Sequence, residues 1–279
     1  MSRVSGSAGS NPAPSASSVK LTPMFREMDT LNTHELAWAA GTFDAEGHAG
    51  SSPHHRGHVR VPLVEVSQAG VEVPALLIRF RRAIGGLGYI TGPRRGYLYY
   101  WRSNQRSVVR AVACLLWPWL GELKKRQFRN ALVLPHDGEM QHSSSPGNAA
   151  SQAHCRAWAA GFFGGEGWIG GAAAAPGRYR WIRMTIAQAT YDGRVPDNLI
   201  RFRMAVGGLG FIHGPYKPTN PWSRHPQYMW ASASYRDVVE ILEGISPWLD
   251  VDRRRRAGDA LSRYRLDPVT PPVGESPVR

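Results

Sequence analysis

Two nine-residue segments of the sequence share a pattern in which the second-last residue is an acid. Residues 39–47 read AAGTFDAEG and residues 159–167 read AAGFFGGEG, so that Glu46 and Glu166 occupy the same place in each. If both segments are helices, each carboxylate faces the negative end of its helix dipole, which is unfavourable by up to about 1 kcal/mol. Two such carboxylates also repel each other when they meet, and a divalent cation relieves both problems. Oxygen ligands suit Mg²⁺, which can activate water and stabilise the leaving oxygen in phosphodiester hydrolysis.

Taken singly, each glutamate is better explained as a solvated charge at a helix end, but the two segments belong to a longer internal repeat. The sequence AWAAG at 37–41 recurs at 157–161, the segment 77–93 recurs at 199–215, and Pro-Trp-Leu at 118–120 recurs at 247–249. Ordered matches of this kind indicate two copies of one fold, with insertions confined to loops.

Small residues in the two helices suggest how the copies meet. Gly41 and Gly161 stand in mid-helix, where glycine costs about 1 kcal/mol relative to alanine. Small side chains allow two helix backbones to approach closely. We therefore expect helices 36–46 and 156–166 to pack against each other across a pseudo-twofold axis, which brings Glu46 and Glu166 together. Separate packing of each helix within its own half is the alternative.

Each half has the same sequence of expected elements. After the first helix, which should end with Gly47 or Gly167 in a left-handed conformation, the pattern predicts two strands, a helix, two strands and closing helices. The expected strands include 58–68, 89–91 and 98–101 in the first half and 179–188, 211–213 and 228–231 in the second. The further expected helices are 74–84, 107–116 and 123–132 in the first half and 196–206, 235–245 and 251–261 in the second. The fold class is therefore α+β, with two tandem αββαββα repeats. Helices on one face of an antiparallel sheet leave the other face open for binding.

Composition limits the function classes. The 279 residues carry a formal net charge of +13 and two cysteines. Two cysteines exclude a disulfide scaffold and a four-cysteine zinc site, and no apolar run is long enough for a membrane helix. The positive charge points to a polyanion such as nucleic acid, although a basic protein without a special partner would share it. We expect an intracellular protein of the cytoplasm or nucleoid, with an organelle as the alternative.

The domain boundaries follow from composition. Residues 1–30 are expected to be a disordered tail because Ser, Ala, Gly and Pro predominate in residues 1–20, and residues 266–279, rich in Pro and Val, a second tail. The polar residues 135–152 are expected to be a linker. The repeats then cover residues 31–134 and 153–265.

The two nonapeptides, the GGLGYI and GGLGFI turns, the strand ends VSQ and IAQ, and Pro-Trp-Leu before a basic helix resemble the LAGLIDADG homing endonucleases. The resemblance covers roughly residues 34–135 and 153–265. It implies a pseudo-symmetric monomer whose two antiparallel sheets form a DNA-binding saddle. It also implies cleavage of both strands of a long double-stranded DNA target, with Mg²⁺ held by the motif acids.

Site residues carried over from the resemblance follow the motifs position by position. Glu46 and Glu166 become the metal-binding and catalytic acids, and Gln68 and Gln188 match a polar active-site position. A basic residue that orders water or offsets charge matches Lys125 in the first half and Arg254 in the second. The motif aspartate is retained as Asp44 but is Gly164 in the second copy, which leaves open a weak or inactive second half.

Candidate DNA-contacting residues are polar side chains on the expected strands and turns, which would face the major groove. They are His54, Arg56, Arg60, Glu65, Arg94, Arg95, Tyr97, Arg178, Arg180, Arg183, His213, Lys217 and Arg224. Because the halves differ at these positions, we expect a partly palindromic target. For any one of these residues, an exposed solubilising charge is an equal alternative.

The leading hypothesis is a site-specific double-stranded DNA endonuclease. The alternative is a nucleic-acid-binding protein on the same scaffold that does not cleave, either an RNA maturase or a DNA-binding regulator. Acids retained in both copies favour the enzyme. The sequence does not give the target, the number of metal ions, or whether RNA binds as well.

Overall fold

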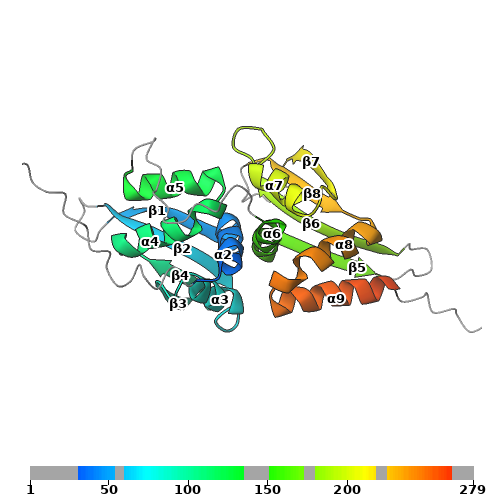
Figure 1. Ribbon diagram of the computed structural model, residues 1–279, viewed down its shortest axis with the longest axis horizontal. Helices are drawn as coiled ribbons and strands as arrows, with labels where there is room; N and C mark the ends of the chain where they lie inside the picture. Colours follow the sequence, from blue (N-terminus) through cyan, green and yellow to red (C-terminus); the bar gives the residue numbers. More distant parts are fainter. Residues whose placement is uncertain (1–30, 54–59, 135–150, 173–179, 218–224, 266–279) are drawn as a thin grey trace, which may run out of the picture. The chain divides into compact units, whose positions relative to one another are not determined.

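A computed structural model describes residues 31–53, 60–134, 151–172, 180–217 and 225–265. The expected tails and nearly all of the expected linker lie outside these residues. None of the described helices is both long enough and apolar enough to cross a membrane. The described chain consists of two halves with the same order of elements (Figure 1).

The first half contains α2 (Thr33–Glu46), β1 (Gly47–Pro53), β2 (Arg60–Ala69), α3 (Ala75–Ala83), β3 (Tyr89–Arg94), β4 (Leu98–Ser103), α4 (Arg106–Leu116), a 3₁₀ turn (Trp117–Trp119) and α5 (Glu122–Leu132). The second half contains α6 (Gln152–Glu166), β5 (Gly167–Ala172), β6 (Trp181–Ala189), α7 (Asp197–Ala205), β7 (Phe211–Tyr216), β8 (Gln227–Ser232), α8 (Tyr235–Ile245), a 3₁₀ turn (Ser246–Trp248) and α9 (Val251–Arg265). The predicted α+β class and the αββαββα repeat are confirmed.

Each half has one four-stranded antiparallel sheet, with strand order β1-β2-β4-β3 in the first and β5-β6-β8-β7 in the second. Alternation along β2 buries Val64 and Val66 completely, while Glu65 between them stays half-buried on the other face. Successive side chains of a strand point to opposite faces, so each sheet has one face in the core under helices and one open face. Trp101 and Trp230 fill equivalent places in the two cores.

The two halves meet along α2 and α6, and the glycines of these helices explain the contact. A Cβ atom added to Gly41 would lie 2.0 Å from the carbonyl oxygen of Trp158, and one added to Gly161 would lie 2.0 Å from that of Trp38. Such separations are impossible for a real side chain, so only glycine lets the two backbones come this close. The expected pairing of the two small-residue helices is confirmed.

The glycines that follow the two helices serve a different purpose from the expected one. Gly47 has φ −78° and Gly167 has φ −82°, which is extended and not left-handed backbone. The prediction of a left-handed end was wrong. A Cβ atom at Gly47 would lie 2.4 Å from the ring of Phe43, and Gly167 is equally close to Phe163. Glycine is needed here for a close approach, because β1 and β5 begin directly on top of a core aromatic ring.

Aromatic rings join the halves near the N-terminal ends of the same helices. His34 of α2 stacks on His154 of α6 with ring centroids 4.3 Å apart. Trp248 of the second half stacks on His34, and Trp119 of the first half stacks on His154, each at 6.0 Å. The four rings form one stack that crosses from each half to the other.

Two equivalent arginines also cross between the halves. Arg79 of α3 donates a hydrogen bond to the carbonyl oxygen of Trp248 at 2.6 Å, and Arg201 of α7 donates one to that of Trp119 at 2.5 Å. The rest of the Arg79 guanidinium is held by both carboxylate oxygens of Glu35. Arg201 has a different acid, described below. The paired helices are therefore fixed at both ends, which determines where their terminal acids lie.

Candidate functional site

Glu46 and Glu166 are the last residues of the two packed helices, and the structure brings them together. A Cβ atom on Gly165 of α6 would lie 2.9 Å from Cγ of Glu46, so the Glu46 side chain lies against the partner helix. Burial, together with the negative charge of Glu46, raises the pKa of Glu166 to about 7. Burial also raises the pKa of Glu46. The two acids thus form one cluster with too little positive charge around it.

The positive charge nearest to both acids is Lys124 in the first turn of α5. Its side chain is buried, and its Nζ donates to the carbonyl oxygen of Gly47. Burial lowers the pKa of Lys124, against the opposing influence of Asp44, Glu166 and Glu46. Lys125, the residue expected from the sequence, instead pairs with Glu122 at 3.0 Å on the surface. The structure therefore corrects the expected position by one residue.

Arg253 occupies the equivalent place in the second half. Its Nη1 donates to the carbonyl oxygen of Gly167 at 2.6 Å, as Lys124 does to Gly47, and its Nη2 donates to that of Gly164 at 2.8 Å. Arg254, the residue expected from the sequence, is exposed. This is the same correction by one residue.

Helical periodicity contains the signal that selects the right basic residues. Lys124 shares the buried stripe of α5 with Phe128 and Ala131, four and seven positions later. Arg253 stands in the same relation to Ala257 and Ala260, the buried residues of α9. A basic residue at the start of an otherwise apolar stripe points inward, whereas its neighbour along the chain does not.

Asp44 is a buried link between the halves. Its carboxylate accepts hydrogen bonds from the backbone N–H of Gly121 at 3.0 Å and from the indole of Trp158 at 2.9 Å. Arg201 lies 3.6 Å away. Burial raises the pKa of Asp44 to about 6, although these neighbours oppose the shift. Because its oxygens are already occupied by protein donors, Asp44 holds the interface together.

In the second half, the corresponding acid belongs to another segment of the chain. Gly164 replaces Asp44, whereas Asp250 replaces Gly121 and accepts a hydrogen bond from the backbone N–H of Arg253 at 2.8 Å. A Cβ atom on Gly164 would lie 4.0 Å from a carboxylate oxygen of Asp250, so the two arrangements place an acid in the same neighbourhood. Gly164 therefore removes nothing from the Glu46–Glu166 cluster.

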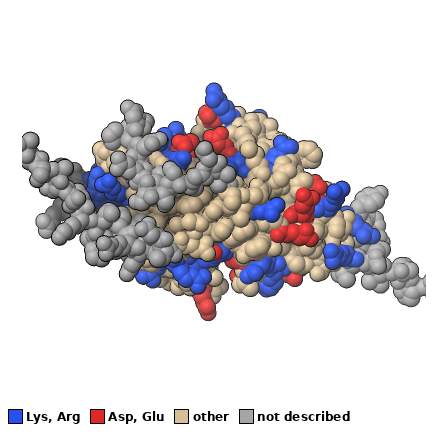
Figure 2. Space-filling view, viewed as in Figure 1, with Lys and Arg blue, Asp and Glu red and all other residues tan. Residues whose placement is uncertain are grey.

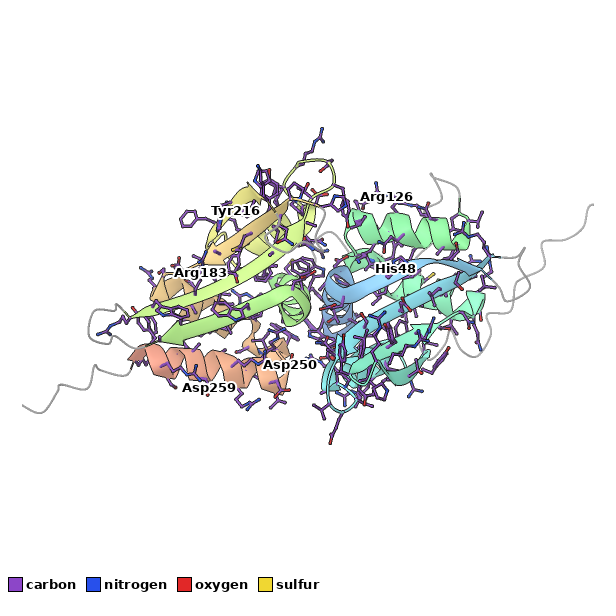
Figure 3. The ribbon with its side chains drawn as sticks, turned by 180° about the vertical axis from the view of Figure 1, so that it is seen from behind. His48, Arg126, Arg183, Tyr216, Asp250 and Asp259 are labelled. Carbon is purple, nitrogen blue, oxygen red and sulfur yellow. The ribbon has the colours of Figure 1, made fainter. Side chains whose placement is uncertain are left out.

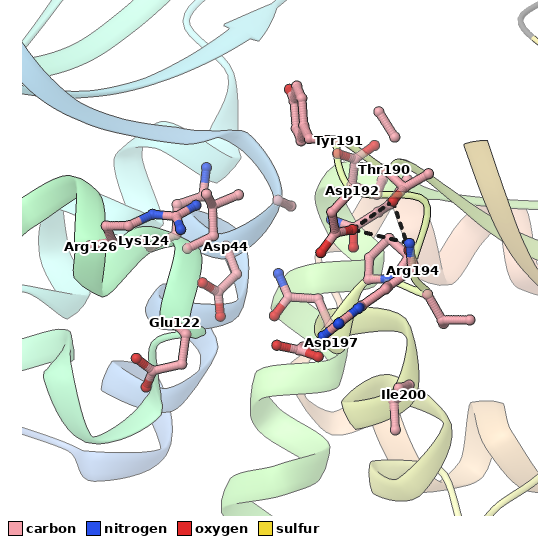
Figure 4. A pocket seen from close by; sticks show the side chains of 18 residues that line it. Asp44, Glu122, Lys124, Arg126, Thr190, Tyr191, Asp192, Arg194, Asp197 and Ile200 are labelled. Atoms are coloured by element: carbon pink, nitrogen blue, oxygen red, sulfur yellow. Dashed lines mark hydrogen bonds between the residues drawn. The ribbon is translucent and has the colours of Figure 1, made fainter. Parts of the chain in front are cut away.

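A cavity of about 890 Å³ opens beside the cluster. Lys124, Glu166 and Gln188 line it together with residues of the β6–α7 loop. Figure 4 shows this loop facing the start of α5, with Thr190 and Arg194 tied to Asp192 by hydrogen bonds. In the other half, the buried Oε1 of Gln68 has no hydrogen-bond partner among the described residues. Both glutamines thus retain acceptor or donor capacity beside the helix ends.

The expected DNA-contacting residues fall into three groups. Glu65, Arg94, Arg183 and His213 belong to the open faces of the sheets, where Arg94 lies over the ring of Tyr100 and His213 bonds to Tyr216. Figure 3 labels Arg183 and Tyr216 in the second half. Arg95, Tyr97 and Lys217 are exposed in turns. His54, Arg56, Arg178 and Arg224 lie outside the described residues.

Arg60 and Arg180 differ from the expectation. Each is an even number of residues from buried positions of its strand, so each belongs to the helix-covered face. The guanidinium of Arg180 lies over the ring of Tyr264 in α9, 5.7 Å from its centroid. On the molecular face shown in Figure 2, basic side chains are spread along the margins and do not gather in one patch.

Sequence reasoning missed Lys124, Arg253 and the roles of Asp44 and Arg201. It also missed the open-face residue Arg102, whose guanidinium lies 3.7 Å from the carboxylate of Glu65. Among the described residues, no three His, Cys, Asp or Glu side chains converge as they would in a metal centre made of protein alone.

No protein-family model matches the sequence, and neither does any curated protein. Solved structures do match. The LAGLIDADG homing endonuclease I-GzeII in complex with DNA target is 12% identical, with TM-score 0.55 over 84% of this chain and 89% of that chain. The LAGLIDADG homing endonuclease I-SmaMI bound to cleaved DNA is 14% identical, with TM-score 0.53 over 84% and 88%. I-SmaMI bound to uncleaved DNA target in the presence of calcium ions is 16% identical, with TM-score 0.51 over 83% and 91%.

Proposed function

The chain has the fold of the LAGLIDADG homing endonucleases, and from it we propose that this protein is a site-specific double-stranded DNA endonuclease. The observation that carries the proposal is the meeting of Glu46 and Glu166 at the ends of two packed helices, beside Lys124. Structural stability does not explain two carboxylates with raised pKa values at one point. One chain supplies both acids, so a monomer suffices.

The donor set at the cluster fits a divalent cation such as Mg²⁺. Glu46 and Glu166 would hold it, since hard carboxylate oxygens are the ligands that Mg²⁺ prefers, and a bound cation would favour the charged form of two acids whose pKa values are raised by burial. Two carboxylates leave coordination positions for water and for phosphate oxygens. The bound ion supplies an activated water and stabilisation of the leaving oxygen.

The basic side chains support this chemistry from both halves. Lys124 places a cation beside both glutamates, where it offsets the charge that an incoming phosphodiester adds. Arg253 offers the same charge in the second half but is held by two backbone carbonyls. The buried Oε1 of Gln68 has no hydrogen-bond partner among the described residues, so this acceptor is available to a donor that enters the site.

DNA binding is supported by the open faces of the two sheets and by the formal net charge of +13. The strands β1 and β5 begin at the residue after Glu46 and Glu166. DNA that presents a phosphodiester to the acids must therefore pass over both open faces. The solved structures with this fold include complexes with DNA targets, which supports the same partner here.

The test is cleavage of a randomised double-stranded DNA library. We expect Mg²⁺-dependent enrichment of one cut sequence, no cutting in EDTA, and no cutting by Glu46→Gln. Glu122→Gln is the matched control, because Glu122 is an exposed acid on the nearby α5. Cutting by Glu46→Gln at the wild-type rate would refute the assignment of the acids. Sequence-specific binding without cutting by the wild type would instead favour a DNA-binding regulator or a maturase.

Lys124→Met should lower the cleavage rate by about 10- to 100-fold, because it removes the buried cation beside the acids. Lys125→Met should cut as the wild type does, since Lys125 pairs with Glu122 and lies over the ring of Trp117, and does not contact the two acids. Single-turnover cleavage of the selected duplex measures both variants. A larger loss of cleavage rate in Lys125→Met than in Lys124→Met would favour Lys125, the residue expected from the sequence.

A further inference from the structure

Corresponding rows of side chains cross the two open faces, and they differ in chemistry. Strand register places His48 opposite Glu65, Glu65 opposite Arg102, and Arg102 opposite Tyr89, so these four residues form one row across the first sheet. In the second sheet the same pairing connects Trp168, Thr185, Ala231 and Phe211. We call these the charged row and the apolar row.

Both rows lie at the start of their sheets, next to the acid cluster. His48 and Trp168 are each two residues beyond the helix-end glutamate. At about 3.3 Å per residue, the rows lie within a few ångströms along the strand of the point where the strands begin. A duplex engaged by Glu46 and Glu166 therefore passes over these rows, after the open-face positions around Ser67 and Ala187 that lie level with the two acids.

The apolar row exposes more hydrophobic surface than folding explains. Phe211 is 74% exposed and Trp168 is 49% exposed, although an antiparallel sheet has a complete core on its other face. Trp168 also stacks with Trp181 of the neighbouring strand, with ring centroids 6.2 Å apart. The stacked Trp168 and Trp181 form an exposed apolar patch, and such a patch on a soluble protein usually marks a binding surface. Phe211 is a second exposed apolar side chain at the other edge of the row, with Thr185 half-buried and Ala231 buried between the two edges. The charged row has no such patch, because the Glu65–Arg102 ion pair stands at its centre.

We propose that the apolar row reads the C5-methyl groups of thymines in one half of the DNA target. This inference rests on the proposed function and adds a rule for the target sequence. In the major groove, the thymine methyl is the one apolar group on a base edge, and aromatic or small apolar side chains are its natural contacts. No side chain of the row carries a formal charge, whereas Arg102 and Glu65 in the charged row are suited to guanine and cytosine edges.

The rows therefore make the target asymmetric at equivalent positions. Thymines belong on the side of the second sheet, and the corresponding positions on the side of the first sheet are occupied by G·C pairs. Arg183, which pairs in register with Gly170 just beyond the apolar row, supplies a charged contact further out.

The test begins with a duplex selected by the wild-type protein from a randomised DNA pool in EDTA, where no cleavage occurs. Each selected thymine is then replaced by deoxyuridine, which removes only the methyl group. We expect weaker binding by about fourfold per contacted methyl, confined to one half-site, because a buried methyl contributes about 0.8 kcal/mol. Fluorescence anisotropy measures the dissociation constants.

Two variants connect the effect to the apolar row. Phe211→Ser should abolish the thymine–deoxyuridine difference at the thymine that Phe211 contacts and keep it at the others, and the exposure of Phe211 leaves the fold intact. The matched control is Tyr89→Ser, at the equivalent position of the charged row, which should retain the fourfold difference. Thermal unfolding of both variants, unchanged from wild type, confirms that the fold persists.

The outcomes separate the two proposals. A pool that yields no sequence refutes the proposed function. A selected sequence whose deoxyuridine duplexes all bind as tightly as the original overturns methyl reading and leaves the function standing. Methyl reading is also overturned, and the proposed function left standing, if Phe211→Ser weakens the binding of every duplex equally and keeps the fourfold difference between thymine and deoxyuridine duplexes.

Discussion

Replacing Glu166 with Gln should abolish cleavage, by at least about 100-fold, and at the same time stabilise the metal-free protein at pH 8. The loss of activity follows from the loss of one of two carboxylates that would hold the metal. The gain in stability follows from the raised pKa of about 7. Folded protein binds the Glu166 proton more tightly than unfolded chain does, so this contribution to stability is lost as the pH rises from about 4.5 to about 7.

A full shift of this size corresponds to about 3 kcal/mol. Solvent reaches the Glu166 side chain at the cavity and screens its charge, so we expect a gain nearer to 1 kcal/mol at pH 8. At pH 5 the difference from wild type should be smaller, and it should disappear below about pH 4. Urea unfolding in EDTA at these pH values measures it. Asp259→Asn, an exposed acid on α9 (Figure 3), should change neither stability nor cleavage.

Mg²⁺ should reverse the order of stability of the wild type and Glu166→Gln. If Glu46 and Glu166 hold Mg²⁺ as proposed, the ion should stabilise the folded wild type by mass action, whereas Glu166→Gln lacks one of the proposed ligands. The urea concentration at the midpoint of wild-type unfolding should therefore rise with Mg²⁺ concentration, and that of the variant should rise less. Equal shifts would show that Glu166 does not hold the ion.

Replacing Gly41 with Ala should destabilise the protein by about 3 kcal/mol or more. The new methyl group would lie 2.0 Å from the carbonyl oxygen of Trp158 and 2.9 Å from the amide nitrogen of Phe162, both backbone atoms that cannot turn aside. The two helices must move apart. That movement also separates Glu46 from Glu166, so the cleavage rate of the folded fraction should fall as well.

Other helical glycines provide matched controls. Gly161→Ala should have the same effect, because its environment is the pseudo-symmetric copy. Gly258→Ala on α9 meets no atom within 4 Å and should stabilise by up to about 1 kcal/mol through helix propensity. Thermal unfolding ranks the variants. Equal stability of Gly41→Ala and Gly258→Ala would contradict the close helix contact.

The sequence predicted the repeated fold and the meeting of the two acids because both depend on patterns that survive in each copy. Small residues at helical spacing identified the paired helices, and the repeated Glu46 and Glu166 identified their shared end. Those features are local in the sequence, and the internal repeat supplied a second independent example of each. One copy alone would have left Glu46 explained as an ordinary helix-end charge.

The finer site could not be obtained in the same way. Choosing Lys124 over Lys125 requires the apolar stripe of α5 to be traced back from Phe128, which packs against Phe43, and the motif alignment alone does not give that rotation. The relocation of an acid from Asp44 to Asp250 depends on two segments far apart in the chain. The apolar row is invisible in any single strand, because its four members come from four strands and meet only through register.

The buried charges between the halves have a consequence for how the copies recognise each other. Asp44 of the first half lies 3.6 Å from Arg201 of the second half and accepts a hydrogen bond from Trp158, whereas the second half has Gly164 at the corresponding position. Two second halves joined in this way would lack the Asp44 carboxylate and both of these contacts. The interface therefore favours an unlike pair over a pair of second halves.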